Sequence, residues 1–144
     1  MSKKILYATD FSSASAHTFG EALKIAKLTG ADLVVAHVLH FPPMVGSAFL
    51  PNAEENEAAM RDWCRHRLDQ LAANARTAGT NAETILKEGP IVHAGILAIA
   101  DETGAGLIVV GTHGRTGLSK MVLGSVAARV ITEADCPVVT VRSR

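Results

Sequence analysis

Four glycines and a serine follow an apolar run in the last third of the sequence. They are Gly111, Gly114, Gly117, Gly124 and Ser125. Glycines leave the backbone free of side chains, so successive amide N–H groups can point into one concavity and hold an anion. The pair Gly124-Ser125 falls near the start of the next expected helix, where unpaired N–H groups favour phosphate. This spacing predicts a phosphate-binding segment, and Arg115 and Lys120 add positive charge beside it.

The alternative is that these glycines only make a tight turn between a strand and a helix. The convergence of four glycines and a hydroxyl favours binding over that interpretation. The segment is not a P-loop, because no Gly-Lys pair occurs anywhere in the chain. Gly104-Ala105-Gly106 comes before an apolar run instead of after one, and we interpret it as a structural turn.

Other polar residues follow the apolar runs. Asp10 ends the first run and could contact a metal or a ribose, or could stabilise the start of the next helix. His37 and His40 should point to opposite faces of a strand, which makes a shared metal difficult and favours core or loop roles. His113 could donate to phosphate, or could face solvent while its backbone binds. The serines show no nucleophile-elbow pattern, so hydrolase chemistry has weak support.

These residues need elements to position them, and apolar runs alternate with helical periodicity along the whole chain. We expect strands at residues 4–8, 32–39, 82–86, 107–110 and 138–141, and helices at 13–29, 53–78 and 90–100. The region after Gly117 is expected to lead into a last helix that runs through about Ile131. Pro90 is expected at the first helical position. Alternating strands and helices predict an α/β fold, a doubly wound open parallel sheet of five strands with helices on both faces. Ligands of such sheets bind at the carboxyl ends of the strands.

The composition excludes several other classes of protein. The 144 residues fit one domain, and 48% hydrophobic with only 4% aromatic residues predicts a core of Val, Ile, Leu and Ala. Fourteen basic and fourteen acidic residues balance, which disfavours nucleic-acid and membrane partners. Cys64 and Cys136 match no metal pattern and are expected to be reduced thiols. No signal-peptide or membrane-helix run is evident, so we expect a cytoplasmic location.

The glycine spacing also carries a resemblance. Gly111-x-x-Gly114, nine residues and then Gly124-Ser125 is similar to the G-2x-G-9x-G-[ST] motif of ATP-binding universal stress proteins. Residues 4–12, His37-Val38 and 136–139 look like the first, second and last strands of that family. The resemblance implies strand order 3-2-1-4-5, with the ligand between strands one and four. It also implies ATP with Mg²⁺ as the cofactor.

Carried onto this sequence, the resemblance implies that Asp10 lies near the ribose and phosphates and that the Val38 backbone meets the adenine. Ala8 departs from the family, where proline often stands before the Thr-Asp pair, and it relaxes the backbone there. The full set of residues expected to bind the nucleotide is Ala8, Thr9, Asp10, Val38, Val110, Gly111, Thr112, His113, Gly114, Arg115, Thr116, Gly117, Gly124, Ser125 and Val126.

We therefore expect a nucleotide-dependent regulator of the stress response. Two alternatives stay open: a slow ATPase, for which no catalytic base is obvious, and a nucleotide-free dimeric interaction protein. The last strand, residues 138–141, is β-branched and would form an undefended edge, so a homodimer is expected through it. A proline at Val139 is expected to remove a ladder donor at the centre of that interface.

Overall fold

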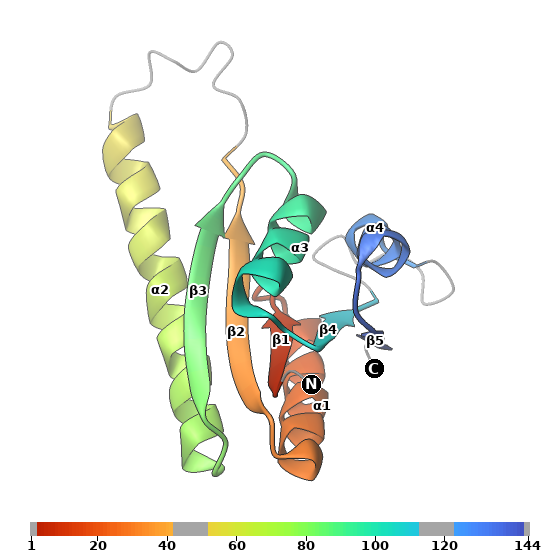
Figure 1. Cartoon of the computed structure of the whole chain (residues 1–144). Helices are drawn as coiled ribbons and strands as arrows, with labels where there is room; N and C mark the ends of the chain where they lie inside the picture. Colours follow the sequence, from red (N-terminus) through yellow and green to blue (C-terminus); the bar gives the residue numbers. More distant parts are fainter. Residues whose placement is uncertain (1–2, 42–51, 113–122, 143–144) are drawn as a thin grey trace.

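The computed structural model describes residues 3–41, 52–112 and 123–142 and contains one parallel sheet. The strand order is β3-β2-β1-β4-β5, which confirms the predicted topology (Figure 1). The strands are β1 (Lys4–Ala8), β2 (Asp32–Leu39), β3 (Ala82–Glu88), β4 (Leu107–Gly111) and β5 (Val138–Val141). The helices are α1 (Ser13–Thr29), α2 (Ala53–Thr77), α3 (Val92–Thr103) and α4 (Ser125–Glu133).

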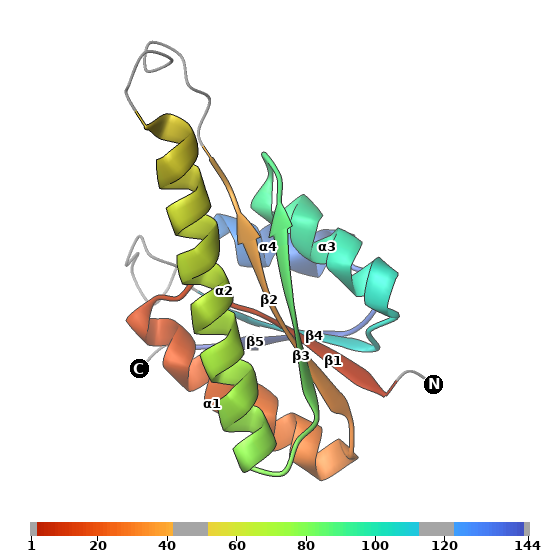
Figure 2. The ribbon, with the colours of Figure 1, turned by 90° about the vertical axis from the view of Figure 1, so that its left-hand side faces the viewer.

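Helices cover both faces of the sheet, with α1 and α2 on one face and α3 and α4 on the other (Figure 2). Side chains alternate between the faces along each strand, so the protein has two cores. Leu6 and Val34 belong to the core under α3 and α4, whereas Tyr7 and Val35 belong to the core under α1 and α2. This two-sided burial explains why β2 is apolar along almost its whole length instead of alternating.

Two of the helices end at glycines, and the start of α3 is not where the sequence predicted it. Gly30 and Gly104 cap α1 and α3 with φ of +71° and +68°, a conformation that suits glycine. The prediction that Pro90 begins a helix is wrong, since α3 begins at Val92. The chain stays paired one residue past β3, where the Gly89 amide donates to the Leu39 carbonyl at 3.1 Å, and Pro90 therefore belongs to the turn.

Helix α2 buries its apolar face only in part. Cys64 and Leu68 are buried, but Met60 is 45% exposed because the start of α2 projects beyond the carboxyl edge of the sheet (Figure 1). Arg61 binds both carboxylate oxygens of Glu88 at 2.8 and 2.9 Å. This pair lowers the pKa of Glu88 and links α2 to the end of β3.

Strand β5 forms one edge of the sheet. Its register shows that Val139 is the wrong position at which to remove an outward-facing donor with proline. The carbonyls of Pro137 and Val141 accept hydrogen bonds from the β4 side at 3.0 and 2.9 Å. Because the direction of backbone groups alternates along a strand, Val139 also directs its groups to β4. Val138 and Thr140 therefore present their N–H and C=O groups at the open edge. A proline at Thr140, not Val139, removes an outward donor.

Close packing between α3 and β2 gives a prediction about stability. A Cβ atom at Gly95 would lie 2.7 and 2.8 Å from the two γ-methyl carbons of Val38, closer than real Cβ contacts. Gly95→Ala is expected to destabilise the fold by about 1–3 kcal/mol through overpacking, despite the gain in helix propensity. Urea denaturation measures the difference.

Two further variants control this prediction. Gly20→Ala places a methyl group in open space on α1 and should be neutral or stabilising. In the Val38→Ala background, where the γ-methyl groups are gone, Gly95→Ala should cost little. Equal unfolding free energies for Gly95→Ala and Gly20→Ala would contradict the close packing.

Candidate functional site

A cavity of about 600 Å³ opens at the carboxyl ends of β1, β2 and β4. Its position is the switch point of the sheet, where the order reverses between the neighbouring strands β1 and β4. The connections after β1 and β4 lead to opposite faces there, which leaves a crevice above the sheet. The volume lies in the range of small-ligand sites.

The first turn of α4 forms one wall of the cavity. Gly124, Ser125, Val126 and Ala127 all line it, and no acidic side chain lies in that turn. Gly124 is the N-cap, and among the residues that the structure describes no side chain caps the helix there. The amides of a first turn and the positive end of the helix dipole favour an anion. The Gly124 amide donates to the Thr112 carbonyl at 2.7 Å, which brings the start of α4 to the end of β4.

Asp10 stabilises the start of α1 and also lies at the cavity. Its Oδ1 accepts a hydrogen bond from the Ser12 amide at 2.9 Å at the start of α1, and Asp10 also lines the cavity. Ser12 occupies the N-cap position of α1 without a side-chain capping bond. The carboxylate of Asp10 therefore supports the helix start while it adds a negative, oxygen-rich group to the cavity.

A polar network fixes the end of β1 beneath this carboxylate. The Tyr7 hydroxyl donates to the Ser15 carbonyl at 2.8 Å, and the Ser15 and Thr9 hydroxyls lie 2.7 Å apart. His37 Nδ1 lies 2.7 Å from the Thr9 carbonyl, which can only accept, so Nδ1 carries the proton. Burial raises the pKa of Tyr7, which keeps its hydroxyl protonated as a donor.

Apolar side chains form the rest of the cavity wall. Val38 and Val110 rise from the strand ends, and Val92 and Ile96 come from α3. A wall of this kind suits a flat apolar group, while the amides of α4 suit an anionic one. The cavity thus offers an apolar part and an anion-binding part to the same ligand.

All of the predicted binding residues that the structure describes lie at this cavity. They are Ala8, Thr9, Asp10, Val38, Val110, Gly111, Thr112, Gly124, Ser125 and Val126. The predicted residues His113, Gly114, Arg115, Thr116 and Gly117 lie outside the described residues.

Sequence reasoning missed part of the lining. It had treated His37 and His40 only as core or loop residues, yet both line the cavity, as do side chains from helices on both faces. The missed residues are Ser15, Thr18, His37, Leu39, His40, Phe41, Met60, Cys64, Val92, Ile96 and Ala127. Strand and helix periodicity could not identify these residues, because the cavity is lined by residues from the ends of the strands and from helices on both faces of the sheet.

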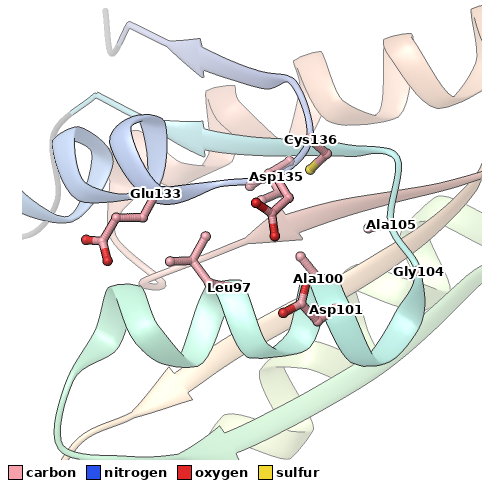
Figure 3. Close-up of a pocket in the computed structure, with 9 residues that line it drawn as sticks. Leu97, Ala100, Asp101, Gly104, Ala105, Glu133, Asp135 and Cys136 are labelled. Carbon is pink, nitrogen blue, oxygen red and sulfur yellow. The ribbon is translucent and has the colours of Figure 1, made fainter.

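A second, smaller hollow of about 260 Å³ lies near the opposite ends of β4 and β5. Figure 3 shows Asp101 on α3 and Glu133 and Asp135 on the other side, all with carboxylates at the hollow. Burial and the neighbouring Asp135 raise the pKa of the Cys136 thiol. Three carboxylates repel an anion, so this hollow does not compete with the cavity at the switch point for a phosphate ligand.

The described residues contain neither a cluster of metal ligands nor a membrane-spanning helix. Within residues 3–41, 52–112 and 123–142, no three His, Cys, Asp or Glu side chains are grouped so that they could hold a metal ion. No helix in the same parts of the chain is long and apolar enough to cross a membrane.

Fold and cavity together define a doubly wound α/β protein with a cavity at its switch point. The family model described as "Universal stress protein family" matches residues 1–142, and the chain belongs to that family. Universal stress protein MJ0531 of Methanocaldococcus jannaschii is 34% identical over 140 residues, which cover 97% of this chain and 82% of the relative.

Two solved structures extend the comparison. The structure of MJ0577 of Methanocaldococcus jannaschii superposes with a TM-score of 0.84 at 27% identity and covers 100% of this chain and 98% of its own. The universal stress protein from Archaeoglobus fulgidus in complex with dAMP has a TM-score of 0.65 at 27% identity, with 95% of each chain covered.

Proposed function

We propose that this protein binds an adenine nucleotide, ATP with Mg²⁺, in the cavity at the switch point and acts as a nucleotide-dependent regulator of the stress response. The observation that carries the proposal is the first turn of α4, whose amides open onto an otherwise mainly apolar cavity of about 600 Å³. The complex of the Archaeoglobus relative with dAMP supports an adenine nucleotide as the ligand class.

Each part of the cavity would bind a different part of the nucleotide. Val38 and its apolar neighbours would hold the base, and Asp10 would accept hydrogen bonds from ribose hydroxyls or help to hold Mg²⁺. The amides of Ser125 and Val126, with the glycine segment 111–117, would bind the phosphates. Mg²⁺ keeps waters and phosphate oxygens as ligands in most nucleotide sites, so one carboxylate is enough protein ligation.

A regulator should hold ATP far longer than an enzyme does, and a single-turnover assay tests this. With protein in excess over radiolabelled ATP and Mg²⁺, we expect retained, intact ATP and hydrolysis far slower than about 1 s⁻¹, the low end of typical enzymes. A rate within the enzymatic range that Asp10→Asn abolishes would favour the slow ATPase instead. Failure to retain any label would favour the nucleotide-free interaction protein.

We further propose a cytoplasmic homodimer paired through β5. The free thiols of Cys64 and Cys136 fit a reducing compartment. The open edge at Val138 and Thr140 presents backbone groups that a second copy can pair, and an antiparallel pair about a twofold axis stops at two chains.

A further inference from the structure

Phe11 has an unusual backbone conformation directly beside the cavity. Its φ of +62° lies in the left-handed region, which a residue with a Cβ adopts only when its surroundings enforce it. Phe11 follows Asp10, which lines the cavity, and precedes the start of α1. A strained residue next to a binding group is a reason to ask what holds it and what it positions.

Two short-range hydrogen bonds hold this conformation. The Phe11 amide donates to Thr9 Oγ1 at 3.0 Å, and the Ser12 amide donates to Asp10 Oδ1 at 2.9 Å. Both acceptors belong to residues that line the cavity. A ligand that contacts Thr9 or Asp10 therefore acts on the same atoms that fix the backbone of Phe11.

The ring of Phe11 continues this connection away from the cavity. Its centroid lies 4.5 Å from that of His37, which lines the cavity, and 5.3 Å from that of Trp63, in an edge-on contact. The guanidinium of Arg67 lies 5.4 Å from the Phe11 centroid and 5.2 Å from the Trp63 centroid. Trp63 is 44% exposed on α2, so a continuous set of contacting rings and a guanidinium runs from the cavity to the surface.

We propose that Phe11 is a positioning residue for the nucleotide site, holding Asp10 and His37 at the cavity and coupling its occupancy to Trp63 and Arg67 on α2. The inference rests on the nucleotide-binding function proposed above. Binding at Thr9, Asp10 and His37 would favour the left-handed conformation of Phe11 over alternatives, because a ligand shifts an equilibrium through its different affinities for the states. Trp63 and Arg67 would then form the surface at which occupancy is sensed.

The chain contains one tryptophan, so its fluorescence reports this coupling without a label. ATP with Mg²⁺ should change the emission of Trp63 in the wild-type protein, and calorimetry should give the affinity independently. Phe11→Tyr keeps the ring and should retain both the signal and the affinity. Phe11→Gly accepts the positive φ but lacks the ring, so it should lose the signal and bind roughly three- to tenfold more weakly.

Two arginine variants separate coupling from general effects on α2. Arg67→Ala removes the cation beside both rings and should reduce the signal at unchanged affinity, whereas Arg65→Ala should change neither. A wild-type protein that binds ATP by calorimetry without a fluorescence change would overturn the inference alone, as would an unchanged signal and affinity in Phe11→Gly. Absence of binding heat and of a signal in the wild type would overturn the proposed function and this inference together.

Discussion

Gly124→Val is expected to abolish ATP binding while the fold is retained. Gly124 is the N-cap of α4 and lines the cavity, so three additional carbons would occupy space where the helix amides meet the phosphates. Its φ of −61° and ψ of 152° are accessible to any L-residue, which removes backbone strain as a cause of unfolding. The loss of a favourable N-cap should cost at most about 1 kcal/mol.

Equilibrium dialysis with labelled ATP measures this effect, with thermal unfolding as the check on folding. We expect affinity to fall by more than roughly a hundredfold, the size of effect associated with losing about 3 kcal/mol of binding free energy. Gly20→Val is the matched control, because it makes the same substitution at an exposed position of α1 that does not line the cavity. Near-normal ATP affinity in folded Gly124→Val would show that α4 does not bind the phosphates.

Thr140→Pro is expected to convert a β5-paired dimer into a monomer. The register places the Thr140 amide at the open edge of the sheet, so proline removes an intermolecular donor and leaves the pairing with β4 intact. Light scattering at micromolar concentration should give the wild type roughly twice the chain mass of 15.1 kDa and the variant a mass near 15.1 kDa.

Val139→Pro distinguishes edge pairing from damage to the sheet itself. The Val139 amide faces β4, so its loss should lower the thermal midpoint of unfolding, an effect that Thr140→Pro should largely lack. A wild-type mass near 15.1 kDa would refute the dimer. A Thr140→Pro protein as dimeric as the wild type would place the interface elsewhere.

The sequence was most informative where a local pattern has one physical cause. The unbroken apolar run of β2 is typical of a strand covered on both faces, and Gly30 and Gly104 stand at helix ends because glycine adopts the left-handed φ there without steric strain. The spacing of Gly111 and Gly124 located the cavity because strand ends and helix starts meet at a switch point.

Other features depend on long-range packing and could not be predicted. Pro90 was assigned to a helix because nothing local reveals that Gly89 continues the pairing to Leu39. Met60 follows the helical period of a buried face, but the sheet ends before reaching it. The left-handed Phe11 has no sequence signature, since its conformation depends on the Thr9 and Asp10 side chains.

The most direct test of the central claim is the nucleotide content of the protein itself. Freshly purified protein is denatured, and the released small molecules are identified by mass spectrometry, with the Gly124→Val variant purified in parallel. We expect an adenine nucleotide from the wild type and far less from the variant, because both would meet the same cellular pool. If the protein binds no nucleotide in this measurement, and none after dialysis against millimolar ATP and Mg²⁺, the proposed nucleotide-binding function is contradicted.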